Sequence, residues 1–364
     1  MPEGWGMAKI SIQVTTWNSR KYLKDCFDSI FSQDWQDFSV LVIDNASTDK
    51  TVEFIKQSYP GVYSLENVRN LGFAKANNQG IKITESEFIL VMNPDIVLNR
   101  NFLTRLVRAM ERDKKIASAG GKLLKIKLGD IELDEKIRTK IIDSTGLKIL
   151  KSRRALDRGE GEQDLGQYDR ARDVFGISGA CVLYRREALE DIKVPIIRNS
   201  YIRKKFAIRS KADEVVYEYF DENFFAYKED IDLAWRLRLR GWKAVYVPGA
   251  LAYHFRGVTG HKGRLRKVDL AIQARKTPMI NFYAYRNHLW MLLKNSFWSN
   301  LFRHFWFIFF YQLKKELYLL FTQPGILIKG SLAFWKGYCK MMTKRKYILG
   351  RAKLGPGEMR KWFR

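Results

Sequence analysis

The sequence predicts an α/β fold with a doubly wound, mostly parallel, Rossmann-like sheet. Short apolar runs at 10–16, 38–43 and 88–92 have the length and the β-branched residues of buried strands, and the segments between them place apolar side chains at helical spacing. Alternating strands and helices produce right-handed crossovers, with helices on both faces of one sheet. Ligands of such sheets bind beyond the carboxyl ends of the strands.

The strand and helix units follow one another in order. Residues 10–16 alternate apolar and polar side chains as a strand does, and the apolar stripe from Tyr22 to Phe31 has helical spacing. The strand at 38–43 is followed by a polar turn and a second helix. A loop rich in glycine and asparagine, 70–80, then enters a third helix before the third strand.

The middle of the chain is expected to complete the sheet. After a helix at 102–110, the polar and charged stretch 122–172 is interpreted as a hairpin followed by a mobile loop. The segment 174–184 returns to the sheet, and Gly179 within it would let a ligand approach the backbone closely. A short strand at 244–247 follows.

The positive charge is concentrated in the C-terminal part of the chain. The 364 residues carry a formal net charge of +26, and the segment 262–364 holds 22 Lys and Arg against three acidic residues. Such a surface needs an anionic partner: phosphates of nucleic acid, lipid headgroups or a phosphate-bearing substrate. We therefore expect a catalytic domain at 8–262, with halves at about 8–120 and 121–262, and a basic, aromatic, helical extension at 263–364.

This C-terminal extension has the composition of amphipathic helices that lie in a membrane interface. Aromatic segments at 281–295 and 297–321 are interrupted by Lys, Arg and His, so no apolar stretch reaches the roughly 18 residues that span a bilayer. The end of the chain, 344–364, is expected to be a frayed basic tail. Scattered cysteines and an N-terminus without a signal-peptide pattern favour the cytoplasm, on the inner face of the cell membrane.

Polar clusters follow the predicted strands. They are Thr15–Asn18, Asp44–Asn45 and Asn93–Asp95. Because the carboxyl ends of parallel strands meet at one edge of a sheet, we expect these side chains to surround a ligand. Taken alone, Asn93-Pro94-Asp95 is also compatible with an ordinary turn. Each polar residue of 70–80, taken singly, fits a polar loop equally well.

The densest acidic cluster is Glu229-Asp230-x-Asp232, at the expected start of a helix and directly after the aromatic loop 220–227. Acids at a helix N-terminus stabilise the helix dipole by about 0.3 to 1 kcal/mol each. Three acids in four residues exceed what that role requires. Since neighbouring carboxylates raise one another's pKa toward the range useful for proton transfer, we interpret the cluster as catalytic.

The ordered series of motifs resembles the family 2 inverting glycosyltransferases with the GT-A fold. It is closer still to the rhamnosyltransferase-like branch that builds bacterial surface polysaccharides. The resemblance covers about residues 8–262 and rests on the order, because no single motif is rare. The motifs are Thr16-Trp17-Asn18-Ser19, Asp44-Asn45-Ala46-Ser47-Thr48-Asp49, Asn70-x-Gly72-Phe73-x4-Asn78-x-Gly80, Asn93-Pro94-Asp95, Ser178-Gly179-Ala180, Glu229-Asp230-x-Asp232 and His254.

The resemblance implies a Mg²⁺ or Mn²⁺ ion held by Asp95 and His254. The family usually supplies Asp-x-Asp at this point, whereas this chain has Asn93 in the first position, which removes one charge from the metal site. A lone histidine is more often structural, and only the resemblance makes His254 a metal ligand.

The resemblance also implies a nucleotide-diphosphate sugar as donor. Asp44 would accept a hydrogen bond from its base, and Arg256 would close over its diphosphate. The expected donor-binding residues are Thr15, Asn18, Asp44, Asn45, Asn70, Lys75, Asn78, Asn93, Gly179 and Arg256.

The resemblance assigns the general base of an inverting transfer to Asp230, with Glu229 and Asp232 orienting or tuning it. The expected reaction moves a sugar, with L-rhamnose from dTDP-rhamnose as the first candidate, to a hydroxyl of a lipid-linked saccharide. An anionic membrane surface would be the second partner.

Two other functions are compatible with parts of the sequence. Transfer to a polyprenyl phosphate is disfavoured, because relatives with that activity generally carry Asp-x-Asp and clear spanning helices. A basic nucleic-acid-binding protein would explain the positive charge but not the acidic and glycine-rich strand ends. We therefore expect no nucleic acid among the partners.

Overall fold

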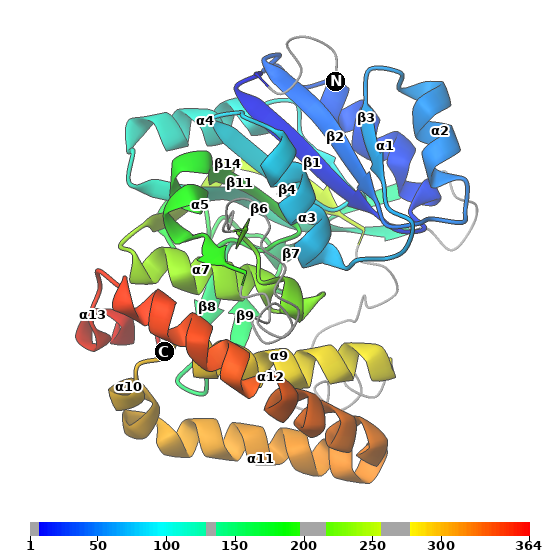
Figure 1. Ribbon diagram of the computed structural model, residues 1–364. Coiled ribbons are helices and arrows are strands. Elements are labelled where there is room, and N and C mark those ends of the chain that lie inside the picture. The colour runs from blue at the N-terminus through cyan, green and yellow to red at the C-terminus, as the bar shows by residue number, and fades with distance from the viewer. Residues whose placement is uncertain (1–6, 129–135, 197–215, 256–276) are drawn as a thin grey trace, which may run out of the picture.

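The centre of the computed structural model is a ten-stranded mixed sheet with helices on both faces (Figure 1). The structure describes residues 7–128, 136–196, 216–255 and 277–364. The strands of this sheet are β1 (Ile10–Thr16), β2 (Phe38–Asp44), β3 (Tyr63–Glu66), β4 (Phe88–Met92), β5 (Ile96–Leu98), β6 (Ile116–Leu128), β7 (Lys136–Ser144), β10 (Arg172–Asp173), β11 (Cys181–Arg185) and β14 (Lys243–His254).

The strand order is β10-β14-β6-β11-β4-β1-β2-β3, with β5 paired to β14 and β7 to β6. The N-terminal strands β3, β2, β1 and β4 are parallel. Their apolar, β-branched sequences suit burial on both faces. Strand β11 enters antiparallel between β4 and β6, and β14 runs parallel to β6. The predicted α/β class and mostly parallel sheet are confirmed.

Helices cover the sheet on both faces, as a doubly wound fold requires. They are α1 (Arg20–Phe31), α2 (Thr51–Ser58), α3 (Phe73–Ile83), α4 (Phe102–Arg112), α5 (Arg186–Ile192) and α7 (Glu229–Leu239). Helices α1, α2 and α4 share one apolar core with the sheet, and α3, α5 and α7 share the other. The spacing of apolar residues in the sequence accounts for these faces.

Within 122–172, the described residues 122–128 and 136–172 contain two hairpin pairings, including one in the part that was expected to be a mobile loop. The first is the antiparallel β6–β7 hairpin, and a second hairpin joins β8 (Leu147–Ile149) to β9 (Ala155–Asp157). Lys122 is buried and pairs with Asp164 at 2.8 Å and with Asp169 at 2.5 Å. Lys122 and its two carboxylate partners, all from this stretch, therefore neutralise one another.

The C-terminal helices lie on the side of α7 that faces away from the sheet (Figure 1). They are α9 (Pro278–Asn295), α10 (Trp298–Arg303), α11 (Phe305–Thr322), α12 (Pro324–Gly350) and α13 (Pro356–Arg360). Leu233 and Leu237 of α7 belong to the core under the sheet, whereas Trp235 and Leu239 belong to a core shared with α9 and α12. Helix α7 is thus covered on two sides.

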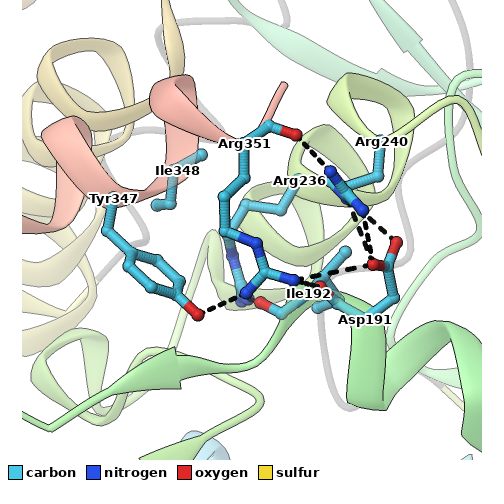
Figure 2. A pocket seen from close by; sticks show the side chains of 7 residues that line it. All are labelled: Asp191, Ile192, Arg236, Arg240, Tyr347, Ile348 and Arg351. Atoms are coloured by element: carbon cyan, nitrogen blue, oxygen red, sulfur yellow. Dashed lines mark hydrogen bonds and ion pairs between the residues drawn. The ribbon is translucent and has the colours of Figure 1, made fainter. Parts of the chain in front are cut away.

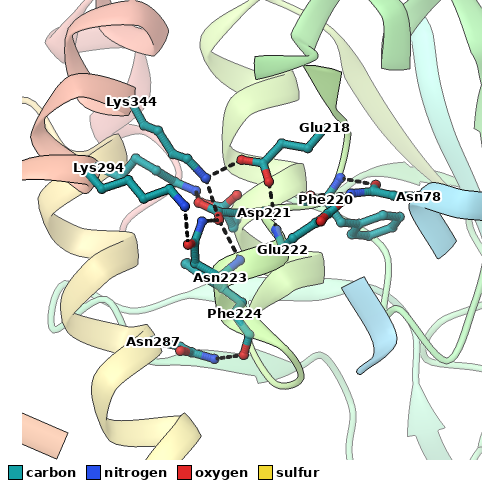
Figure 3. A network of polar contacts seen from close by, with 12 residues as sticks. Asn78, Glu218, Phe220, Asp221, Glu222, Asn223, Phe224, Asn287, Lys294 and Lys344 are labelled. Atoms are coloured by element: carbon teal, nitrogen blue, oxygen red, sulfur yellow. Dashed lines mark hydrogen bonds and ion pairs between the residues drawn. The ribbon is translucent and has the colours of Figure 1, made fainter. Parts of the chain in front are cut away.

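A buried ionic cluster joins these helices to the segment 218–232 (Figure 3). Lys294 of α9 contacts Asp221 at 2.5 Å and Asp232 at 2.8 Å, and Lys344 of α12 contacts Glu218 and Asp221. Burial lowers the pKa of Lys344, but the charges of Asp221 and Glu218 outweigh burial and raise it. The same two lysines hold the pKa of Asp221 well below its usual value, against the effect of burial.

The expected frayed tail at 344–364 is wrong. Lys344 is 1% exposed, and Met359 and Phe363 lie in the core shared with α7. The Phe363 ring is 5.4 Å from the ring of Trp235. The basic residues were misleading because the chain uses one of them to neutralise buried carboxylates far away in the sequence.

A second set of ion pairs fixes the end of α12. Arg240, just after α7, contacts Asp191 of α5 at 2.7 Å, and Arg351 approaches the same carboxylate at 3.7 Å. Arg351 also donates a hydrogen bond to the hydroxyl of Tyr347. Figure 2 shows these side chains around a pocket whose arginines are already paired, so we interpret it as a contact between helices.

Replacing Lys344 with methionine should destabilise the fold by about 3 to 5 kcal/mol, because buried carboxylates would lose a cation. Lys346→Met, at an exposed position of the same helix, should change stability by no more than about 0.5 kcal/mol. Urea unfolding measures both. Equal midpoints for the two variants would show that the cluster does not stabilise the fold.

Candidate active site

The site is assembled where the parallel strands end. Thr16 of β1 lies in register with Asp44 of β2. Past the end of β4, the N–H of Asn93 donates to the carbonyl of Ala180 at 2.8 Å. This contact brings Gly179 to the edge at which β1, β2 and β4 end.

A chain of three side chains forms the first part of the site. Nε2 of His254 is 3.2 Å from Oδ2 of Asp95, and Nδ1 of His254 is 2.8 Å from Oδ2 of Asp143. Pairing of β14 with β5 places His254 opposite Ile96, next to Asp95. Burial alone would lower the pKa of His254, but hydrogen bonds to Asp143 and Asp95 raise it to about 9.

Asp95 and His254 fit a divalent cation. Oδ1 of Asp95 is buried and has no hydrogen-bond partner among the described residues. A carboxylate oxygen beside an imidazole nitrogen suits Mn²⁺, and Mg²⁺ is usually bound by one or two carboxylates together with substrate phosphates. Within the described ranges, no three His, Cys, Asp or Glu side chains converge on one point, so this part of the protein supplies a partial ligand set.

Asp143 was missed by the sequence reasoning. It is fully buried near the end of β7, inside the stretch that was interpreted as hairpin and loop. The signal was present, because Ile141-Ile142 precedes Asp143-Ser144 just as apolar runs precede Asp44 and Asn93. A carboxylate on the far nitrogen of a metal-binding histidine fixes its tautomer and orientation.

Asp230 forms the second part of the site. Its Oδ2 accepts a hydrogen bond from the N–H of Gly179 at 3.1 Å, and its Oδ1 accepts one from the N–H of Ile231 at 2.8 Å. A Cβ at Gly179 would lie 3.0 Å from the Cβ of Asp230, so glycine is what allows this approach. Asp230 is also the one residue of α7 that is not buried.

Glu229 differs from Asp230 in its environment. Burial, and then the charge of Asp230, raise the pKa of Glu229 to about 8. Its Oε2 has no hydrogen-bond partner among the described residues. Glu229 is therefore mostly protonated at neutral pH and adds little negative charge beside Asp230, a division of roles typical of neighbouring catalytic carboxyls.

The structure does not bring Asp232 to this group. Both of its oxygens are used elsewhere: Oδ2 accepts from Arg236 at 3.0 Å, and Oδ1 contacts Lys294 and accepts from Asn295 at 2.7 Å. Asp232 is fully buried in the ionic cluster. The three acids of the motif therefore occupy three different environments.

The residues expected near the donor's base are held by local hydrogen bonds. The Asp44 carboxylate accepts from the Thr16 hydroxyl at 2.7 Å and from the Ser47 hydroxyl at 2.6 Å. Oδ1 of Asn18 accepts from the N–H of Thr48 at 2.8 Å. These contacts show that the carboxylate of Asp44 holds the polar turn that follows β2.

Asn45 and Asn70 shape the glycine and asparagine loop. Oδ1 of Asn45 accepts from the N–H of Leu71 at 3.3 Å, and Oδ1 of Asn70 accepts from the N–H of Gly72 at 2.8 Å. The hydroxyl of Thr15 is buried and has no hydrogen-bond partner among the residues described.

Asn78 is used to hold the chain ahead of the acidic cluster. Its amide accepts from the N–H of Phe220 at 2.9 Å and donates to the carbonyl of the same residue at 2.8 Å. Lys75 is half-buried on the same helix. Arg256 lies outside the described residues.

Residues 11–193 match the family described as Glycosyl transferase family 2. Two proteins of Mycobacterium tuberculosis strains, both named N-acetylglucosaminyl-diphospho-decaprenol L-rhamnosyltransferase, are 28% identical to this chain over 230 residues. The alignment covers 59% of this chain and 66% of theirs, so the chain spans just under two thirds of their length. A Methanococcus voltae protein is 30% identical over 128 residues, or 32% of this chain and 40% of that protein. It is named dolichyl N-acetyl-alpha-D-glucosaminyl phosphate 3-beta-D-2,3-diacetamido-2,3-dideoxy-beta-D-glucuronosyltransferase.

The fold has a solved counterpart. The crystal structure of GalNAc-T7 with UDP, GalNAc and Mn²⁺ matches with a TM-score of 0.53 at 13% identity, covering 80% of this chain and 48% of that one. At this identity the likeness shows the GT-A fold alone. The family match itself includes Asp44 and Asp95 but ends before Asp230 and His254. Because it covers half of the chain, from β1 to the end of α5, the chain belongs to glycosyl transferase family 2.

Proposed function

We propose that the protein is a metal-dependent, inverting glycosyltransferase. It would move a sugar from a nucleotide diphosphate to a hydroxyl of a lipid-linked saccharide in cell-surface polysaccharide synthesis. The observation that carries the proposal is the pairing of Asp95 with His254, together with the partly open Asp230, at the carboxyl ends of the strands. Similarity to the two M. tuberculosis rhamnosyltransferases supports L-rhamnose as the sugar, with dTDP-rhamnose as the first candidate donor.

Asp95 and His254 would hold Mg²⁺ or Mn²⁺ on the donor side. When bound, the ion supplies Lewis acidity toward the departing diphosphate. Asp143 keeps Nδ1 of His254 engaged, so that Nε2 stays directed toward Asp95. His254 must give up its proton to serve as a ligand, and metal affinity should therefore rise with pH.

Asp230 would act on the acceptor side. As the acceptor hydroxyl attacks the anomeric carbon opposite the nucleotide, Asp230 takes the hydroxyl proton and the configuration inverts. The N–H groups of Gly179 and Ile231 fix the direction of the carboxylate. Neutral Glu229 keeps a second negative charge away from the base.

The C-terminal helices would rest on an anionic membrane surface at the inner face of the cell membrane. Large apolar side chains are exposed together on α10, α11 and α12: Phe302, Phe305, Trp306, Phe307, Phe309, Phe310, Leu313, Leu317, Leu320, Phe321, Ile328, Leu332 and Trp335. Exposed Arg303, Lys314, Lys329 and Lys336 lie on the same helices. Such a surface suits helices lying in the headgroup region.

No helix in the described part of the chain is long and apolar enough to cross a bilayer.

Donor binding should raise the melting temperature only in the presence of metal. A ligand at 100 times its dissociation constant stabilises the folded state by about 2.7 kcal/mol. Among dTDP-, UDP- and GDP-sugars with Mn²⁺, we expect dTDP-rhamnose to give the largest shift. Asp95→Ala should lose the Mn²⁺-dependent part of the donor-induced shift in melting temperature. Asp34→Ala, which removes an exposed carboxylate, should keep that part of the shift. Equal shifts in Mn²⁺ and in EDTA would rule out the metal site.

Asp230→Asn should reduce transfer to a lipid-linked acceptor by about 10² to 10⁴-fold, because asparagine cannot take the proton. The donor-induced thermal shift should remain, since the donor side is unchanged. Glu187→Gln, at an exposed position of α5, serves as the control and should transfer sugar normally. Turnover of Asp230→Asn close to that of the wild type would exclude Asp230 as the base.

Flotation with vesicles tests the membrane surface. The protein should float with vesicles containing anionic lipid, and the double variant Trp306→Glu, Phe310→Glu should stay at the bottom. Val68→Glu, Leu165→Glu adds the same charge at exposed apolar positions elsewhere and should float like the wild type. Tight binding to DNA without affinity for anionic vesicles would favour a nucleic-acid-binding protein instead.

A further inference from the structure

The loop that leads into α7 has an unfavourable backbone. Phe225, at φ 64° and ψ −67°, forms a γ-turn closed by a 2.7 Å hydrogen bond from the N–H of Ala226 to the carbonyl of Phe224. Tyr227 and Lys228 follow with φ of 68° and 77°. None of the three residues with positive φ is a glycine, so other contacts must hold this conformation.

Asn287 of α9 supplies such contacts. Its Nδ2 lies 2.9 Å from the carbonyl oxygen of Phe224, 2.9 Å from that of Ala226 and 2.8 Å from that of Tyr227, so that its two N–H groups serve three carbonyls and one hydrogen bond is shared. Asn287 is fully buried, and Figure 3 shows its amide directed at the loop. A single side chain therefore binds three of the four carbonyls between 224 and 227.

The remaining carbonyls of the loop have donors as well. The guanidinium of Arg286 donates to the carbonyl of Asn223 at 2.7 Å. The N–H of Ala74 in α3 donates to the carbonyl of Phe225 at 3.2 Å. The N–H of Asp232 donates to the carbonyl of Lys228 at 2.9 Å. Every backbone carbonyl from 223 to 228 is thus satisfied, and Asn287 satisfies the largest share.

Helix α9 is itself fixed on both sides of this loop. Two helical turns after Asn287, Lys294 forms ion pairs with Asp221, which precedes the loop, and with Asp232, which follows it. Asn295 also donates a hydrogen bond to Asp232. These contacts fix the position of α9, and with it the position of the Asn287 amide. Only Glu229 separates the loop from Asp230.

We propose that Asn287 is the positioning residue for the base: it holds the loop 224–228 in its unfavourable conformation and so sets the direction of the first turn of α7. Without the amide, Tyr227 and Lys228 relax toward negative φ and Asp230 leaves the N–H of Gly179. The catalytic part of this proposal rests on the proposed function, whereas the restraint on the loop does not.

Two readouts test the proposal on the full chain. Hydrogen exchange of peptides spanning 220–232, followed by mass spectrometry, reports the loop without any substrate. The steady-state rate of sugar transfer from the sugar nucleotide reports whether Asp230 is positioned to act as the base. For Asn287→Ala we expect at least tenfold faster exchange in this segment and at least a tenfold lower kcat, with the KM for the donor within twofold of the wild type.

Asn281→Ala is the matched control. Asn281 is a buried asparagine of the same helix, but its amide donates to Gln323 at 3.1 Å, away from the loop. This variant should lower the melting temperature without changing loop exchange or kcat. Loss of kcat in both variants in proportion to lost stability would overturn the positioning role.

The remaining outcomes are interpreted as follows. Unchanged loop exchange in Asn287→Ala overturns the proposal, and so does faster exchange with unchanged kcat. If the wild type transfers no sugar from any donor while loop exchange still rises in Asn287→Ala, the proposed function fails and the restraint on the loop stands. If Asn287→Ala does not fold, Asn287→Ser, which keeps one hydrogen-bond donor, is measured in the same way. Its loop exchange rate and its kcat are expected to lie between those of the wild type and the tenfold changes given above.

Discussion

The arrangement of the site depends on six buried charges. Carboxylates of Glu218, Asp221 and Asp232 meet Lys294, Lys344 and Arg236, and each of these residues is at most 3% exposed. Removing such charges from water is costly, and loss of any one of them leaves its partner unpaired in the interior. The C-terminal helices therefore cannot separate from the segment 218–232 without a large loss of stability. In this protein the extension acts as part of the framework that holds α7.

The site itself combines two kinds of strand. The parallel strands β1, β2 and β4 end at one edge, as expected for this sheet. Antiparallel β11 brings Gly179 to that edge, and β7 with β14 brings Asp143 to His254. The pair of Asp95 with His254 and the Asp230 carboxylate thus come from different parts of the chain, and Gly179 contacts Asp230 at this edge.

Local patterns predicted the sheet well because strand and helix periodicity is a property of short segments. The same approach failed where a side chain depends on a distant partner. Lys344 and Glu218 are 126 positions apart, so nothing near 344 in the sequence indicated burial. The partners of Asp232 could not be predicted for the same reason, since Asn295 lies 63 positions away. Asp143 was missed because the charged segment that contains it was interpreted as a hairpin and a mobile loop, and no site residue was sought there.

The burial of α7 has one more consequence. Ten of its residues, all but Asp230, are enclosed between the sheet and the C-terminal helices. Substitutions at those ten positions are constrained by packing and by ion pairs, whereas the side chain at position 230 is partly exposed to solvent. A substitution at position 230 can therefore change the charge that this helix presents to solvent without repacking the helix.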